Sequence, residues 1–157
     1  MKSLVVYYSN TGNTRHIADL ISYGLSSDVA EIKEEKNRAN EFSLYFLGSI
    51  EAILNLKSKI KPITKDYSKY DLVLIGSPVW AGHIPPAVRT FVEENKINFK
   101  NYAIFSTSGS GEDSKKAFSQ ISGAIGREPF AVLSFSSKEL TEKKEIPAVE
   151  RFLKKLR

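Results

Sequence analysis

The sequence of 157 residues contains no cysteine, and only one tryptophan, one methionine and two histidines. Without cysteine the chain can form no disulfide, supply no thiolate ligand to a metal and offer no thiol nucleophile, which suits a reducing compartment. There is also no apolar run of about 18 residues and no basic segment followed by an apolar leader. We therefore expect a cytoplasmic protein that neither spans a membrane nor is secreted.

Acidic residues are the minority among the charges, with 18 Asp and Glu against 23 Lys and Arg, for a net charge of +5. Much of the excess lies in two groups: Lys57, Lys59, Lys61, Lys65 and Lys69, and Lys154, Lys155 and Arg157. Such groups are usually solvated helix faces and ends. Because no aromatic-interleaved basic strand or recognition helix accompanies them, we expect no nucleic-acid partner.

Apolar patterning predicts strands and helices in alternation within one domain that spans residues 1–157. The predicted strands are Ser3–Tyr8, Val29–Lys33, Asp71–Ile75, Tyr102–Phe105 and Phe130–Ser136, and the predicted helices are Asn13–Ser26, Glu41–Lys59, Pro86–Asn95, Asp113–Gly126 and Pro147–Leu156. This alternation is typical of a doubly wound α/β sandwich with a parallel sheet.

Two helices show an apolar face that we expect to pack against that sheet. In the second helix the face consists of Phe42, Tyr45, Phe46, Ile50, Ile53, Leu54 and Leu56. In the last helix it consists of Ile146, Val149, Phe152, Leu153 and Leu156.

The first predicted strand ends abruptly in the polar run Ser9, Asn10, Thr11, Gly12, Asn13, Thr14, and a helix follows. At such a junction the free N–H groups and the positive dipole end of the helix favour an anion, and the loop adds hydroxyl and amide donors. The run is no Walker A loop, because it has no Lys, and no dinucleotide fingerprint, because it has one Gly. It is no thiol phosphatase loop either, since cysteine is absent. A phosphate site remains, with an ordinary helix cap as the alternative.

The third predicted strand is apolar without alternation, as a central parallel strand should be, and it leads into Gly76–Pro86. This loop holds the only tryptophan, Trp80, between Pro78 and Gly82. Loops present binding sites, and an indole can stack on a flat aromatic ligand. The alternative is that Trp80 folds back onto its own helix as a loop anchor.

The fourth strand is followed by a loop of small residues, Ser106, Thr107, Ser108, Gly109, Ser110 and Gly111. Alone it could be a flexible connection. In an open parallel sheet, however, ligands bind beyond the carboxyl ends of the strands, and all three loops leave such ends.

The runs SNTGNT after the first strand and GSPVWAG after the third resemble the flavodoxin family of short-chain type. The resemblance extends over the chain in element order and implies a flavodoxin-like three-layer sandwich, with a five-stranded parallel sheet of order 2-1-3-4-5. It also implies FMN as cofactor. Ser9, Asn10, Thr11, Gly12, Asn13 and Thr14 would hold the phosphate, and Pro78, Val79, Trp80, Ala81 and Gly82 would line the ring. Ser106, Thr107, Ser108, Gly109 and Gly111 would reach the ribityl chain and the pyrimidine edge.

The sequence departs from the family's usual pattern in two ways. Its third loop has no Tyr to cover the outer face of the ring, and the chain is basic where flavodoxins are usually acidic. A basic surface favours redox partner proteins with acidic surfaces. We expect a monomer or a weak dimer, with both histidines, His16 and His83, at the surface.

Two functions stay open from the sequence. The favoured one is an FMN-binding electron carrier that exchanges electrons with partner proteins and has no catalytic or metal-binding residues of its own. The alternative is an FMN-dependent NAD(P)H:quinone oxidoreductase, for which no nicotinamide site is recognisable. A phosphoacceptor receiver of similar fold is excluded, because Gly76 and Ser77 stand where its Asp would be.

Overall fold

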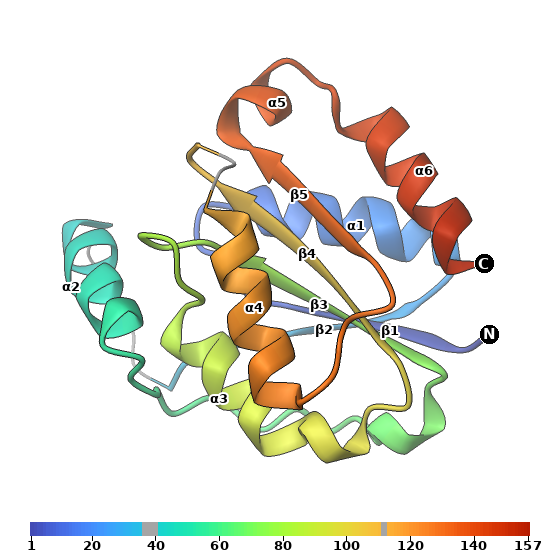
Figure 1. The fold of residues 1–157 in the computed structure, drawn as a ribbon, viewed down its shortest axis with the longest axis horizontal. Coiled ribbons are helices and arrows are strands. Elements are labelled where there is room, and N and C mark those ends of the chain that lie inside the picture. The colour runs from blue at the N-terminus through green and yellow to red at the C-terminus, as the bar shows by residue number, and fades with distance from the viewer. Residues whose placement is uncertain (36–40, 111–112) are drawn as a thin grey trace.

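The computed structural model describes residues 1–35, 41–110 and 113–157, with backbone only for 41–46. A parallel sheet forms its middle layer (Figure 1). The strands are β1 (Ser3–Tyr7), β2 (Asp28–Glu31), β3 (Leu72–Pro78), β4 (Tyr102–Ser108) and β5 (Val132–Ser136). Their order is β2-β1-β3-β4-β5 and every pair is parallel, so the predicted fold class and strand order are confirmed.

The helices cover both faces of this sheet. They are α1 (Asn13–Leu25), α2 (Glu41–Ile53), α3 (Pro86–Asn95), α4 (Ser114–Ile125), α5 (Ser137–Thr141) and α6 (Glu145–Leu156), with short 3-10 turns at Tyr67–Lys69 and Lys96–Asn98. Helices α1 and α6 pack on one face and α3 and α4 on the other, so two apolar cores form. Strand β4 is buried along its whole length, as a parallel strand covered on both faces must be.

Successive residues of the central strands serve the two cores in turn. In β1, Leu4 and Val6 join the core beneath α3 and α4, whereas Val5 joins the core beneath α1 and α6. This follows from the period of two in a strand, which sends neighbouring side chains to opposite faces. The continuous apolar run is thereby buried, and the carboxyl ends of the strands meet at one edge of the sheet.

Helix α2 departs from the prediction. It ends at Ile53 instead of Lys59, and Asn55 after it adopts a left-handed conformation with a φ of 56°. Its described large apolar side chains are exposed, together with two in the segment that follows: Leu47, Ile50, Ile53, Leu54 and Leu56. Phe42, Tyr45 and Phe46 lie outside the described side chains. Figure 1 shows α2 standing apart from the sheet, so the predicted packing of this face against the core is wrong for the described residues.

The physical reason is that α2 packs against the rest of the protein through small residues. Gly48 and Ala52, one helical turn apart, are the buried members of the described part of α2. Apolar periodicity could not reveal this choice, because the helix is apolar around most of its circumference.

The C-terminal region contains one helix that was not predicted. Helix α5 is short, and it is held by a capping box in which the Ser136 hydroxyl and the Glu139 carboxylate bond each other's backbone N–H groups. Helix α6 begins at Glu145, two residues before the predicted start, and Ile146 in its first turn is exposed, contrary to expectation. No helix in the described parts of the chain is long and apolar enough to cross a membrane.

Candidate functional site

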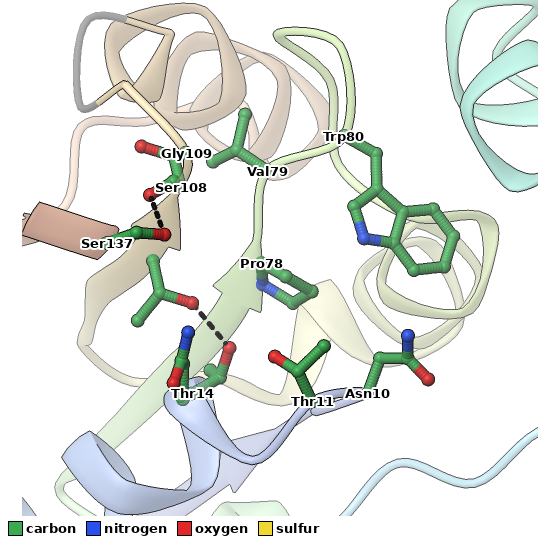
Figure 2. A pocket seen from close by; sticks show the side chains of 11 residues that line it. Asn10, Thr11, Thr14, Pro78, Val79, Trp80, Ser108, Gly109 and Ser137 are labelled. Carbon is green, nitrogen blue, oxygen red and sulfur yellow. Dashed lines mark hydrogen bonds between the residues drawn. The ribbon is translucent and has the colours of Figure 1, made fainter. Parts of the chain in front are cut away.

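A pocket opens at the carboxyl edge of the sheet, where the loops after β1, β3 and β4 meet (Figure 2). Its enclosed volume is about 140 Å³, and about 530 Å³ when the open solvent at its mouth is included. The residues that line it are Asn10, Thr11, Asn13, Thr14, Pro78, Val79, Trp80, Thr107, Ser108, Gly109 and Ser137. The structure thus brings together members of all three predicted loops, and none of the lining side chains carries a charge.

The first loop leads into α1 without a side-chain cap. Gly12 is the N-cap residue, its φ is 95°, and it has no side chain that could occupy the helix end. One donor of the first turn is taken, since the backbone N–H of Arg15 donates to the Ser9 hydroxyl at 3.2 Å. Ser9 therefore shapes the loop and does not line the pocket, whereas Asn10, Thr11 and Asn13 line it and are exposed.

A hydrogen bond joins the first turn of α1 to the end of β4. The Thr14 hydroxyl lies 2.8 Å from the Thr107 hydroxyl, and Thr14 is only 1% exposed. Figure 2 draws this bond as the dashed line that ends on Thr14. Because the two residues are far apart in sequence, the bond holds the floor in place without a ligand.

The predicted third loop begins within the sheet, because β4 extends to Ser108 and not only to Phe105. Its residues divide into a supporting and a lining part. Ser106 is fully buried, and its hydroxyl donates to Ser114 in the first turn of α4, so it supports that helix. Ser108 and Gly109 line the pocket beside Thr107. Gly111 lies outside the described residues.

A fourth loop also contributes, and sequence reasoning missed it. Ser137, directly after β5, lines the pocket, and its hydroxyl donates to the Ser108 carbonyl at 3.3 Å. The sequence did contain a signal for this loop. Ser136 and Ser137 are polar residues at the carboxyl end of a strand, and polar residues at such ends were the reason for predicting that the other three loops bind a ligand.

The second loop forms a tight turn beyond the pocket. Trp80 and His83 exchange backbone hydrogen bonds at 2.8 and 2.9 Å. Between them, Ala81 and Gly82 have φ values of 48° and 79°. Ala81 and Gly82 do not line the described pocket. The ring of His83 bonds the Ala81 carbonyl at 2.7 Å and is 8% exposed, so the predicted exposure of His83 is wrong.

Trp80 reaches the pocket while its indole is mostly packed in the core. It is 7% exposed, meets the ring of Tyr8 edge-on at 5.8 Å between centroids, and contacts the backbone of Gly48 in α2. Figure 2 shows the indole at the side of the pocket opposite Ser137. The indole thus anchors its loop against Tyr8 and α2, whereas the alternative from the sequence expected it to pack on its own helix.

In the described part of the chain, no titratable side chain lines the pocket. The Glu145 carboxylate at the start of α6 accepts from its own backbone N–H and lies 3.1 Å from His16, and both interactions lower its pKa. His16 itself is half exposed, as expected. Among the described residues no cluster of His, Asp or Glu could hold a metal ion.

Residues 47–152, about two thirds of the chain, match the sequence model of a flavodoxin domain family. The chain belongs to this flavodoxin domain family. The predicted resemblance is thereby confirmed. The match includes the loops after β3 and β4 and the turn into α5, whereas the SNTGNT loop lies before it.

Solved structures similar to this flavodoxin-domain protein include a flavoprotein from Lactobacillus acidophilus in complex with FMN. That structure is 28% identical, with a TM-score of 0.74, and the match covers 90% of this chain and 97% of that one. The apo-form of the Lactobacillus flavoprotein gives 27% identity, 90% and 95% coverage and a TM-score of 0.64. A flavodoxin from Streptococcus pneumoniae, at 19% identity, 99% and 97% coverage and a TM-score of 0.61, supports the fold alone. None of the curated proteins compared matches the chain.

Proposed function

We propose that this flavodoxin-domain protein binds FMN in the pocket and transfers electrons between partner proteins. The observation that supports it most is the donor set at the α1 end of the pocket. Asn10, Thr11, Asn13 and Thr14 bring amides and hydroxyls to a helix N-terminus whose cap, Gly12, leaves it open. These groups donate hydrogen bonds without adding charge, which suits the phosphate of FMN.

We assign each part of the cofactor to a different part of the pocket. The first loop, Ser9 to Thr14, would hold the phosphate, with Ser9 acting through the backbone it shapes. Thr107, Ser108, Gly109 and Ser137 would lie along the ribityl chain, and Pro78 and Val79 with the edge of Trp80 would border the ring. Bound FMN supplies one- and two-electron redox chemistry, and the protein supplies position and electrostatics.

The residues of the chain have two tasks in this proposal. The bond between Thr14 and Thr107 keeps the phosphate end ordered before binding, which lowers the entropy cost of capturing the ligand. The packed indole of Trp80 fixes the start of the second loop. Ser106 supports α4, and Ala81 and Gly82 form the turn that carries His83.

One observation favours a second function as an alternative. The lining residues of the third and fourth loops, Thr107, Ser108, Gly109 and Ser137, include no aromatic side chain that could cover the outer face of a flavin. An open face admits a hydride donor or a quinone. The alternative is therefore an FMN-dependent oxidoreductase that uses NAD(P)H and a quinone or similar acceptor.

Titration of the cofactor-free protein tests binding. FMN should bind at least about tenfold more tightly than riboflavin, because riboflavin lacks the phosphate and each charge-assisted bond contributes about 1.5–3 kcal/mol. Equal affinities for the two flavins would contradict the phosphate assignment.

Steady-state kinetics then separates the two functions. The carrier proposal predicts that the FMN-loaded protein oxidises NAD(P)H slowly even with quinone present, and that it passes electrons rapidly to acidic redox proteins in a manner weakened by salt. Rapid quinone-dependent NAD(P)H oxidation would replace it by the oxidoreductase.

A further inference from the structure

The turn in the second loop lies against the beginning of α4. A Cβ built on Gly82, whose φ is 79°, would lie 3.6 Å from Cδ of Lys116 and 3.8 Å from Cγ of Asp113. One helical turn further along α4, the Gln120 side chain accepts from the backbone N–H of Ile84 at 2.9 Å. Positions three and four apart share one face of a helix, so a single face of α4 follows the second loop from its turn onward.

This contact lies close to the pocket. Trp80 lines the pocket and precedes Gly82 by two residues. Two residues of chain span at most about 7 Å, so Cδ of Lys116 lies within about 12 Å of Cα of Trp80. The third loop leads to the same place, because Gly109 lines the pocket and Asp113 follows it by four residues.

The two charged side chains at this contact have no ion partner. Lys116 and Asp113 are both exposed, and within residues 1–35, 41–110 and 113–157 neither forms an ion pair. The described residues that line the pocket carry no charge either. Charges just outside its wall therefore act on the pocket without a charged group in between.

We propose that Lys116 favours the reduced form of FMN and that Asp113 opposes it, so that this pair of charges sets the redox poise of the bound cofactor. The inference rests on the proposed function. Reduction of FMN by two electrons from a partner protein, with uptake of one proton, leaves one added negative charge on the ring. A cation near the ring stabilises that charge and an anion destabilises it.

Lys115 provides an internal comparison. It is the next residue along α4, so its side chain leaves the helix about 100° away from that of Lys116. It lines a groove on the β5 side of α4 together with Phe118 and Val132. The same charge is thus present on two different sides of one helix, and only Lys116 contacts the second loop at Gly82.

Redox titration of the FMN-loaded protein at low ionic strength tests the proposal, because the midpoint potential of bound against free FMN gives the ratio of affinities for the reduced and oxidised forms. Lys116→Gln should lower this ratio at least about threefold, which is about 14 mV for a two-electron couple. Asp113→Asn should raise it by a similar factor. Lys115→Gln is the matched control and should change it less than about 1.5-fold.

Salt and a conservative variant separate an effect of charge from an effect of packing. The shifts should disappear at 1 M salt, where the Debye length is only about 3 Å. Lys116→Arg keeps the charge and should keep the ratio of the unsubstituted protein.

Four outcomes would overturn the inference. An unchanged ratio in Lys116→Gln with FMN bound would refute it and leave the proposed function intact. Equal shifts in Lys115→Gln and Lys116→Gln would show that net charge, and not the contact at Gly82, sets the ratio. A shift that persists at 1 M salt would assign the effect to packing. Failure of the unsubstituted protein to bind FMN would refute both the inference and the proposed function.

Discussion

The two ends of the pocket are built on different principles. At the α1 end, Asn10, Thr11 and Asn13 are exposed polar side chains that contribute little to the core, and they are available to a ligand. At the β3 end, Trp80 is packed against Tyr8 and Gly48 and is part of the core. From this difference we expect one end to contribute mainly to ligand affinity and the other mainly to folding free energy.

Trp80→Ala should show the largest effect, and it should act on folding. Removal of a buried tryptophan costs about 3–5 kcal/mol, because a cavity forms where the indole met Tyr8 and Gly48. Urea unfolding of the cofactor-free protein measures this loss. At a temperature where the variant stays folded, its FMN affinity should fall by less than its stability. An unchanged stability with abolished FMN binding would reverse our assignment of the two ends.

Thr14→Val should act on binding. It removes the hydroxyl that contacts Thr107 and that we assign to the phosphate, so FMN affinity should fall roughly 10- to 100-fold, or about 1.5–3 kcal/mol. Riboflavin affinity should change far less. Calorimetric titration with both flavins measures the pair of effects.

A matched control for Thr14→Val is Thr107→Val, which breaks the same bond from the other side. If loss of the bond alone explained the weaker binding, the two variants would lose equal FMN affinity. We expect the larger loss at Thr14.

Gly48→Ala should disturb the β3 end without removing any atom of it. A Cβ at Gly48 would lie 2.8 Å from Cζ3 of the Trp80 indole, so the ring or α2 must move. We expect a loss of about 1–3 kcal/mol in stability and a shift of the tryptophan emission. Gly123→Ala is the control, since a Cβ there meets nothing within 4 Å, and in α4 it should stabilise by up to about 1 kcal/mol. Equal effects of both substitutions would show that the Trp80 contact is loose.

Ala81→Gly should show the smallest effect. Ala81 has a φ of 48°, a conformation that glycine adopts without the steric cost that a Cβ brings. Relief of that cost is partly offset by the greater freedom of glycine in the unfolded chain, so we expect a gain below about 1 kcal/mol. Thermal unfolding of the cofactor-free protein measures it, and a clear loss of stability would show that the Ala81 methyl makes contacts of its own.

The sequence alone predicted most of the scaffold. Uninterrupted apolar runs located β1, β3 and β4, and Pro86 and Gly126 marked a helix start and a helix end correctly. These features are local: a strand covered on both faces needs apolar residues throughout, and proline and glycine have narrow conformational preferences.

The parts that could not be predicted depend on contacts between distant segments. The burial of Trp80 requires Gly48 and Tyr8 as neighbours, and nothing near Trp80 in the sequence indicates them. The burial of His83 follows from the same turn, whose form depends on a left-handed alanine at position 81. Helix α2 was misjudged because apolar residues surround most of it, so the pattern could not say which side is buried.

The bond between the Thr14 and Thr107 hydroxyls affects how their hydrogens are oriented. Either oxygen can be the donor in this bond, so two arrangements of the hydrogens satisfy the same geometry. An anion that accepts from Thr14 removes this freedom: Thr14 must then turn its hydrogen toward the anion and accept the hydrogen of Thr107. Capture of a phosphate by the loop after β1 would therefore set the direction of a hydrogen bond that begins at the end of β4.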